Sequence, residues 1–243
     1  MEKSLVIIPT YNEKENIQDI IEAVFDLKDS FDVLIVDDGS PDGTADIVKK
    51  SMTNHPSLHL LERKGKLGLG TAYIDGFKYA LDKGYDYIFE MDADFSHNPT
   101  DLIFLKKACS EEGNDMAIGS RYISGVNVVN WPMDRVLMSY CASIYVQFIT
   151  GIPIKDTTAG FKCYTRKVLE AIGPENVHFV GYAFQIEMKF LAWKYGFKIK
   201  EVPIIFTDRT KGISKMSRGI FKEAVIGVIQ MKIKSLFKKY IVA

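Results

Sequence analysis

The chain has 243 residues, 47% of them hydrophobic, and its 31 basic side chains balance 31 acidic ones. That length and apolar content suffice for one substantial core. The zero formal net charge leaves no overall positive field, so we expect no nucleic acid among the partners of this protein.

The cysteines and the N-terminus exclude several classes of protein. Cys109, Cys141 and Cys163 are odd in number and form no C-x-x-C pair, which fits neither a disulfide framework nor a zinc site. We expect a reducing compartment and buried thiols. The apolar run 5–8 is broken by Pro9, so it lacks the core of a signal peptide. No stretch reaches the roughly 18 consecutive apolar residues of a spanning helix, so we expect a chain that is not exported and that contacts a membrane only at its surface.

Short runs rich in β-branched residues alternate with helical patterns in the first half of the chain. The strand-like runs are 5–8, 33–36, 58–61, 87–91 and 116–118. Helices are predicted over 17–24, from about Thr44 to before Pro56, and over 69–81 with a stop at Gly84. This alternation predicts an α/β fold with a mostly parallel central sheet flanked by helices.

The pattern changes after Arg121. Residues 122–135 predict a long loop, which is typical of a mobile or functional segment. A mostly apolar helix is predicted over 136–150, a further helix over 179–195 and a strand over 198–206. From Gly219 onward, apolar residues form one face of a helix and lysines supply charge elsewhere.

Acidic residues follow two of the predicted strands. Asp37 and Asp38 come directly after the run 33–36, and a turn-rich segment with Asp42 follows them. In an open parallel sheet, ligands bind beyond the carboxyl ends of the strands. A carboxylate there can accept hydrogen bonds from a base N–H or from ribose hydroxyls, whereas Asp42 is also explained as a helix cap. Two adjacent acids on a buried strand end are costly unless paired, which favours a binding role.

Asp92 and Asp94 repeat this arrangement after the run 87–91. Their i, i+2 spacing lets both carboxylates converge on one cation. Mg²⁺ and Mn²⁺ prefer oxygen ligands, and Mg²⁺ commonly binds through one or two carboxylates plus substrate phosphates. Such a cation offsets the charge that grows on a diphosphate leaving group. A D-x-D triplet is also common at solvated turns, but with the second acid pair it predicts a site that cleaves a nucleotide diphosphate sugar.

Several segments together resemble one enzyme family. They are PTYNE at 9–13, VDDGSPDGT at 36–44, LGLGTAY at 67–73, MDAD at 91–94, GSRY at 119–122, DR at 208–209 and SK at 214–215. In this order they resemble the dolichol-phosphate (polyprenol-phosphate) mannose synthases, which are inverting family 2 glycosyltransferases with the Rossmann-like GT-A fold. The resemblance implies transfer of mannose from GDP-mannose to a polyprenyl monophosphate, with Mg²⁺ or Mn²⁺ as the cofactor.

The resemblance also implies roles for individual residues. Those that match the guanosine site are Pro9, Tyr11, Glu13, Val36 and Asp38. Those that match the metal and diphosphate site are Asp92, Ala93 and Asp94, with Asp92 and Asp94 as the metal ligands. The cationic positions expected near the diphosphate or the acceptor phosphate are Arg121, Arg209 and Lys215. These three cations and Asp94 form the implied catalytic set.

The chain departs from the processive members of family 2. The Q-x-x-R-W signature is absent, since Gln185 is followed by Ile-Glu-Met, which disfavours polymer synthesis. No membrane-spanning extension follows residue 215. We therefore expect a compact enzyme with a catalytic domain over 1–218 and a C-terminal amphipathic basic helix over 219–243.

A lipid phosphate acceptor changes what the catalytic residues must do. The second pKa of a phosphate monoester is about 6, so this nucleophile is largely ionised at neutral pH. No dedicated general base is then required, and alignment and charge neutralisation remain. Arg209 and Lys215 suit that task, because arginine offers a planar fork of donors and lysine a mobile point charge. Without the resemblance, the same residues are explained as a solvated basic loop.

Other functions stay open at this point. An enzyme of this kind can use another nucleotide sugar, such as UDP-glucose, or another acceptor. A non-catalytic nucleotide-sugar binding protein on the same fold is the third alternative. A nicotinamide enzyme is excluded, because Gly65, Gly68 and Gly70 do not have the order of a dinucleotide-binding loop.

Some features have competing explanations. Asp156 either shapes the acceptor side or makes a turn, and Glu187 is better explained as a salt-bridged helix residue. His97 is expected to support the acidic triplet or to lie exposed, and no histidine is assigned a catalytic role. The helix 136–150 either lines an acceptor-lipid groove or, as is more common for such a pattern, belongs to the core.

The C-terminal helix has the stronger case for contact with a membrane. Basic residues beside a wide apolar face resemble an interfacial helix. Packing of that face on the domain, or on a small membrane-anchoring partner, explains the pattern equally well. The localisation that follows is cytoplasmic and peripheral, on the cytoplasmic face of a membrane.

Overall fold

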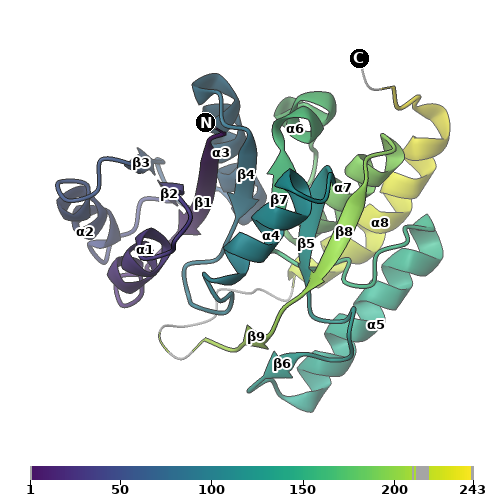
Figure 1. Cartoon of the computed structure of the whole chain (residues 1–243). Coiled ribbons are helices and arrows are strands. Elements are labelled where there is room, and N and C mark those ends of the chain that lie inside the picture. The colour runs from purple at the N-terminus through teal and green to yellow at the C-terminus, as the bar shows by residue number, and fades with distance from the viewer. Residues whose placement is uncertain (1, 210, 212–218, 242–243) are drawn as a thin grey trace.

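A seven-stranded sheet forms the centre of the computed structural model, which describes residues 2–209, 211 and 219–241. The strand order is β3-β2-β1-β4-β7-β5-β8 (Figure 1). The strands are β1 (Ser4–Thr10), β2 (Asp32–Asp37), β3 (Leu58–Glu62), β4 (Tyr87–Glu90), β5 (Met116–Ser120), β7 (Lys162–Thr165) and β8 (Ile199–Pro203). β7 runs antiparallel to both of its neighbours, and the other pairs are parallel. The predicted α/β fold with a mostly parallel sheet is confirmed.

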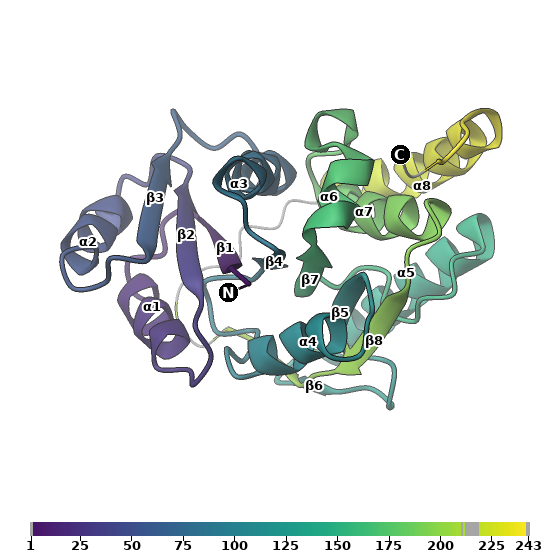
Figure 2. The ribbon, with the colours of Figure 1, turned by 45° about the horizontal axis from the view of Figure 1, so that its top comes forward.

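Helices cover both faces of this sheet. They are α1 (Ile17–Phe25), α2 (Thr44–Ser51), α3 (Leu69–Lys83), α4 (Asp101–Ser110), α5 (Met133–Thr150), α6 (Arg166–Ile172), α7 (Tyr182–Lys194) and α8 (Gly219–Phe237), with a 3-10 turn at Pro174–Asn176. Figure 2 shows α3, α6 and α7 on one side of the sheet and α1 and α4 on the other. Along β1, Leu5 and Ile7 enter the core beneath α3, while Val6 and Ile8 enter the core beneath α1. Because both faces are buried, the strands have continuous apolar sequences.

The second half of the chain differs from the predicted elements. The predicted strand 198–206 is two strands, since β8 ends at Pro203 and the chain leaves the sheet after the Ile204 amide, which donates to the Ser120 carbonyl at 3.1 Å. The second part, β9 (Phe206–Thr207), pairs instead with β6 (Val128–Val129), inside the predicted loop 122–135. The sequence pattern predicts neither β7 nor α6, since β7 is short and begins with the buried Lys162.

The α5 helix contributes only one of its faces to the core, through Val146 with Tyr145 and Ile149 packed beside it, so the core explanation holds for that face alone. Its buried residues are Val136, Ser143, Val146 and Thr150. Apolar side chains at helical spacing are exposed along another face: Met133, Leu137, Tyr140, Ile144 and Phe148. The helix lies at the outer edge of the molecule, where α8 covers only part of it (Figure 1). Cys141 is exposed there, contrary to the expectation of buried thiols, which holds for Cys109 and Cys163.

The C-terminal helix α8 packs against α7 and α5. Val228 and Met231 lie in the main core, whereas Ile229, Ile233 and Leu236 are exposed. Within the described part of the chain, no helix combines the length and the apolar character that a membrane span requires.

Candidate active site

The acidic triplet follows β4 on a loop that turns sharply after Asp94. Asp94 is buried, and its Oδ1 atom accepts a hydrogen bond from the Ser96 amide at 3.1 Å. Phe95 between them has a left-handed φ of 59°, which costs a non-glycine residue on the order of 1 kcal/mol. Asp94 therefore stabilises its own turn through Oδ1, and its Oδ2 atom meets partners outside the loop.

His97 supports the backbone of the triplet. The side chain is buried and stacks on Phe161 with ring centroids 4.8 Å apart. Burial lowers the pKa of His97 to about 4, so the ring is neutral at pH 7. Its Nδ1 atom accepts a hydrogen bond from the Asp92 amide at 3.3 Å. Of the two expectations for His97, support of the triplet is confirmed.

The two carboxylates of the triplet differ in their ionisation. Burial, and then the neighbouring Asp94 carboxylate, raise the pKa of Asp92 to about 7. Burial acts in the same direction on Asp94, but hydrogen bonding from Ser96 and the charge of Arg209 outweigh it and lower the pKa of Asp94. Two adjacent carboxylates with too little positive charge nearby are an arrangement that a divalent cation stabilises.

The donor set of Asp92 and Asp94 fits a hard divalent cation. Among the side chains that the structure describes, no cluster of three or more His, Cys, Asp or Glu residues could hold a metal without further ligands. Two carboxylates are typical of Mg²⁺ or Mn²⁺ that is bound jointly by protein, substrate phosphates and water. The site therefore fits the implied metal when a diphosphate completes the coordination.

Arg209 lies beside the triplet because β9 runs next to the triplet loop. The amide of Thr207 donates to the carbonyl of Ser96 at 3.3 Å. The Nη2 atom of Arg209 is then 2.6 Å from Oδ2 of Asp94, and its Nη1 atom is 3.8 Å from Oε1 of Glu13. The structure thus brings together three predicted site residues that are far apart in the sequence.

Arg121 is also close to the strand ends, but its charge is already paired. Its Nε and Nη2 atoms donate to the two carboxylate oxygens of Asp156 at 2.7 and 2.6 Å, and its amide donates to the same carboxylate at 2.9 Å. The rings of Tyr122, Trp131 and Phe206 lie within 5.6 Å of the guanidinium. Asp156 is therefore the anchor of Arg121, and the pair joins the end of β5 to the segment before β7.

A third arginine on this rim, Arg135, was not predicted. It pairs with Asp208 at 2.9 Å and lies over the Trp131 ring at 4.1 Å. The sequence feature that could have identified Arg135 is its position at the end of the predicted long loop. Lys215, the remaining predicted cation, lies outside the described residues.

The predicted guanosine residues meet at the ends of β1 and β2. Pro9 and Val36 are register partners on these neighbouring strands, and Tyr11 and Asp38 follow them. The Nζ atom of Lys66 lies 5.1 Å from the centroid of the Tyr11 ring. One edge of the sheet thus carries an aromatic ring, a carboxylate and a cation, which together can hold a nucleoside.

Asp38 has a partner that sequence reasoning missed. The Nη1 atom of Arg63 is 2.7 Å from Oδ1 of Asp38, and its Nε atom is 3.1 Å from Oδ2 of Asp75. Arg63 also donates to the Thr71 hydroxyl at 2.6 Å. Burial raises the pKa of Asp38, and the charge of Arg63 opposes that shift. Because Arg63 directly follows β3, its position after a predicted strand was the signal that could have identified it.

Asp37 and Asp42 have structural partners. Asp37 accepts hydrogen bonds from the Thr10 hydroxyl at 2.8 Å and from the Ser40 hydroxyl and amide at 2.6 and 2.9 Å. Asp42 accepts the amide of Thr44 at 3.0 Å, at the first residue of α2. Asp42 therefore stabilises the turn before α2, whose N-cap residue is Gly43. Because Asp37 is occupied by these structural partners, the binding role predicted for Asp37 and Asp38 rests on Asp38.

A buried polar network behind the triplet was also missed. Glu90, directly before the triplet segment, accepts the Tyr164 hydroxyl at 2.7 Å and pairs with Lys162 at 3.0 Å. Gln185 on α7 donates to Glu90 at 2.9 Å. Lys189 donates to three backbone carbonyls at 2.6 to 3.0 Å, two of them in the segment before β7. The network ties β4, β7 and α7 together beneath the site, and charged residues within apolar runs were its signal.

Glu187 and Gly70 have structural explanations. Glu187 accepts the amides of His178 and Phe179 at 2.9 and 3.0 Å, which confirms a structural role for this helix residue. A Cβ atom at Gly70 would lie 2.9 Å from the carbonyl oxygen of Phe179, so α3 approaches this segment too closely for any side chain. This glycine therefore serves helix packing.

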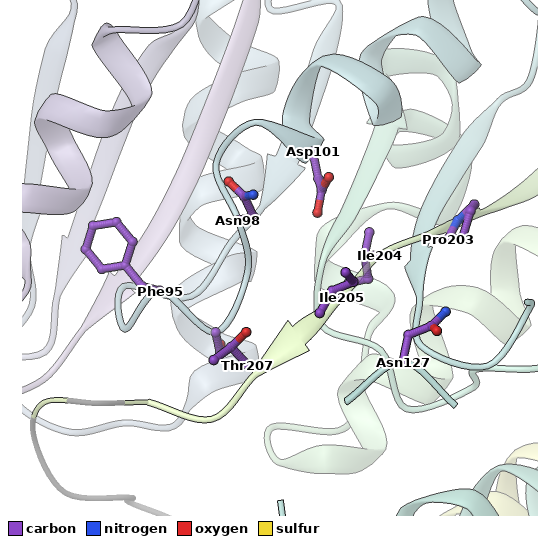
Figure 3. Close-up of a pocket in the computed structure, with 9 residues that line it drawn as sticks. Phe95, Asn98, Asp101, Asn127, Pro203, Ile204, Ile205 and Thr207 are labelled. Atoms are coloured by element: carbon purple, nitrogen blue, oxygen red, sulfur yellow. The ribbon is translucent and has the colours of Figure 1, made fainter. Parts of the chain in front are cut away.

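A cavity of about 430 Å³ opens next to the triplet loop (Figure 3). It is lined by residues of that loop, the start of α4, the residue before β6 and the segment from the end of β8 to β9: Phe95, Ser96, Asn98, Asp101, Asn127, Pro203, Ile204, Ile205 and Thr207. Burial raises the pKa of Asp101 to about 6. None of the predicted donor residues lines this cavity, so it is distinct from the predicted nucleotide site.

Comparisons with known proteins agree with this geometry. A profile of the family described as Glycosyl transferase family 2 matches residues 5–173. The polyprenol monophosphomannose synthase of Mycolicibacterium smegmatis is 44% identical over 234 residues, covering 96% of this chain and 88% of the relative. The undecaprenyl-phosphate mannosyltransferase of Micrococcus luteus is 44% identical over 224 residues, covering 92% of this chain and 91% of the relative.

Solved structures share the fold at low sequence identity. A mannosyltransferase of Pyrobaculum calidifontis in complex with GDP-Man and Mn²⁺ has a TM-score of 0.56 and 17% identity, over 97% of this chain and 74% of that one. TarS of S. aureus in complex with UDP-GlcNAc has a TM-score of 0.66 and 18% identity, over 98% of this chain and 67% of that one. The predicted GT-A type of fold is thereby confirmed. From the family match and the two relatives at 44% identity, we conclude that the chain belongs to glycosyl transferase family 2.

Proposed function

We propose that this glycosyltransferase transfers mannose from GDP-mannose to a polyprenyl monophosphate, with inversion at the anomeric carbon. The observation that carries the proposal is the meeting of Asp92, Asp94 and Arg209 at the strand ends, which suits a metal-bound diphosphate. The names of the two relatives at 44% identity support mannose as the sugar and a polyprenyl phosphate as the acceptor. The complex of the Pyrobaculum enzyme with GDP-Man and Mn²⁺ supports the donor and the metal.

The proposed site has a nucleoside end and a diphosphate end. The guanosine residues of the proposal are Pro9, Tyr11, Glu13, Val36 and Asp38, and those of the metal and diphosphate end are Asp92, Ala93 and Asp94. Mg²⁺ or Mn²⁺ held by Asp92 and Asp94 supplies charge that stabilises the departing diphosphate. Arg63 holds the carboxylate of Asp38 in a fixed position toward the nucleoside.

The chain's own catalytic work in this proposal is alignment and charge neutralisation. Arg209 and Lys215 attract the phosphates of donor and acceptor. Arg121, through its two hydrogen bonds to Asp156, holds the end of β5 in place beside the sugar. The acceptor phosphate is largely ionised at neutral pH, so it attacks the anomeric carbon without a general base.

Exposed apolar residues of α5 and α8 support contact with a membrane that contains the lipid acceptor. The stripe on α5 ends in Phe148, which is 85% exposed, and α8 adds Ile229 and Ile233. Lys234 and Lys238 are exposed on or next to α8. An apolar face with nearby lysines binds anionic lipid surfaces. We therefore propose a peripheral position on the cytoplasmic face of a membrane, with a small membrane-anchoring protein as the alternative partner of these helices.

The test is to incubate the purified protein with labelled nucleotide sugars, a short polyprenyl phosphate and Mg²⁺ or Mn²⁺. We expect a labelled lipid product from GDP-mannose and none from UDP-glucose, with inhibition by GDP and not by UDP. The Asp94→Asn protein serves as the matched negative control. If only a UDP-sugar gives product, GDP-mannose is not the donor and the UDP-sugar takes its place in the proposal. Donor binding without transfer to any acceptor would support a non-catalytic binding protein instead.

A further inference from the structure

We propose that Arg209 occupies the cation side of Asp94 in the donor-free protein and releases it only when a diphosphate offers the guanidinium another anionic partner. Metal and nucleotide then bind cooperatively, and Arg209 sets the strength of that coupling. The inference rests on the proposed function, since it takes Asp94 as a metal ligand. It goes further because it states why the metal site is completed only together with the donor.

Both oxygen atoms of Asp94 are engaged in the structure. Oδ1 accepts the Ser96 amide at 3.1 Å, and Oδ2 lies 2.6 Å from Nη2 of Arg209. Asp94 is only 6% exposed with the arginine in this position. A divalent cation binds a carboxylate oxygen at roughly 2.0 to 2.6 Å, and at that range it would repel the guanidinium strongly. Because the like-charged guanidinium already lies 2.6 Å from Oδ2 of Asp94, we infer that a cation binds this oxygen when Arg209 has moved away.

The surroundings of Arg209 allow its side chain to move while the backbone before it stays in place. The Asp208 amide donates to the Val129 carbonyl at 3.0 Å, and the Asp208 carboxylate pairs with Arg135 at 2.9 Å. The side chain of Arg209 is 24% exposed, whereas that of Arg121 is 8% exposed and enclosed by aromatic rings. We infer that exchange at Asp94 is a side-chain rotation of Arg209 and does not require β9 to separate from β6.

A nucleoside diphosphate supplies both changes that the exchange needs. Its phosphate oxygens accept hydrogen bonds from a guanidinium fork, so Arg209 keeps an anionic partner. The same phosphates complete the coordination of a cation on Asp92 and Asp94. Because coupling between two ligands is reciprocal, GDP must raise the affinity for Mn²⁺ by the factor by which Mn²⁺ raises the affinity for GDP.

The experiment measures Mn²⁺ binding to the full chain by electron paramagnetic resonance, with and without GDP. The variant is Arg209→Gln, and the control is Lys211→Gln, which removes the same charge from an exposed residue that pairs with Asp19. We expect Arg209→Gln to bind Mn²⁺ without nucleotide at least about 5-fold more tightly than the wild type. The enhancement by GDP should shrink by a similar factor, and Lys211→Gln should match the wild type.

Equal Mn²⁺ affinities of the nucleotide-free wild type and Arg209→Gln would overturn the inference. An equal gain in Lys211→Gln would also overturn it, because the effect would then be one of general charge. Absence of Mn²⁺ binding by every protein even with GDP would instead contradict the proposed function. If Arg209→Gln does not fold, Arg209→Lys tests the same point, since a lysine without the fork should compete less well and raise the nucleotide-free Mn²⁺ affinity.

Discussion

Two arginine–aspartate pairs lie at the same end of the sheet and differ in what surrounds them. Arg121 meets both oxygens of Asp156 and is enclosed by three aromatic rings. Arg209 meets one oxygen of Asp94, is partly exposed, and faces a carboxylate that has an acidic neighbour. The first pair balances its charges within the protein and joins two segments. The pair of Arg209 and Asp94, together with Asp92, has an excess of negative charge, which a bound cation can neutralise. We therefore propose the second pair as the functional one, because the fold leaves its charges unequal.

The largest effect is expected from Asp94→Asn, which removes the charge of the exchangeable pair but keeps its shape. We expect transfer to fall by about 1000-fold or more, equivalent to about 4 kcal/mol in the barrier. The free energy of unfolding should change little, because Arg209 is partly exposed. Initial rates with labelled donor and urea unfolding measure the two quantities. Transfer above a tenth of the wild-type rate would contradict the metal assignment.

Asp156→Asn, which breaks the enclosed pair with Arg121, is expected to reduce stability most. The substitution leaves Arg121 buried with reduced compensation, so the free energy of unfolding should fall by about 3 to 5 kcal/mol. Lys49→Gln is the control, since it breaks an exposed pair with Glu62 and should cost less than about 1 kcal/mol. Urea unfolding of the wild type, Asp156→Asn and Lys49→Gln measures the free energy of unfolding of each. A loss for Asp156→Asn as small as that for Lys49→Gln would mean that enclosure does not strengthen the pair of Arg121 and Asp156.

The pH dependence of metal binding sharpens the difference between Asp92 and Asp94. A cation needs Asp92 as a carboxylate, and the raised pKa of about 7 means that the metal-free protein largely protonates it at pH 6. The Mn²⁺ affinity with GDP should therefore fall about tenfold per pH unit below 7 and level off above it. Asp94 adds no such slope in this range, because its pKa is lowered.

Calorimetry in two buffers measures the proton that Asp92 releases. We expect a release close to one proton at pH 6 and little at pH 8, after subtraction of the value for Mn²⁺ and GDP mixed without protein, which accounts for protons from GDP itself. A release at pH 6 no larger than that of Mn²⁺ and GDP without protein would contradict this role of Asp92.

The smallest effect is expected where both pairs stay intact and only the exposed helix changes. Phe148→Ser on α5 should weaken binding to anionic vesicles about 5-fold, because it removes apolar area that is free to enter the lipid. Phe104→Ser on α4 is the matched control. Phe104 is also an exposed phenylalanine, but α4 packs on the other face of the central sheet from the one against which α5 packs. Sedimentation with vesicles compares the two, and equal losses would contradict a role for α5 in docking.

Much of the fold and part of the site were predictable from local patterns. The apolar runs of the first half are strands buried on both faces, and acids directly after such runs necessarily lie at their carboxyl ends. This reasoning placed Asp38, Asp92 and Asp94 at the same end of the sheet, where the structure has them. It failed for β7, because this short strand begins with Lys162, and a buried lysine is tolerated there because it pairs with Glu90 on the neighbouring strand and donates to Gln185 on α7.

The partners of the site residues were not predictable in the same way. Arg63 and Asp38 are 25 residues apart, and Arg121 and Asp156 are 35 apart. Such pairings depend on strand order and on the packing of connecting segments, which no local pattern encodes. The same holds for α5, whose sequence is as apolar as that of a core helix, while its position at the edge of the molecule leaves one face exposed.

The sequence by itself determined which strands would end in acids and that a metal-bound diphosphate was the ligand to expect there, because residue type and period act locally. Only the tertiary structure decided which cation each acid meets. It enclosed Arg121 with Asp156 and left Arg209 exchangeable on Asp94, since burial and neighbouring charge are properties of the assembled fold. The free energy of an ion pair depends on that environment more than on the two residues that form it.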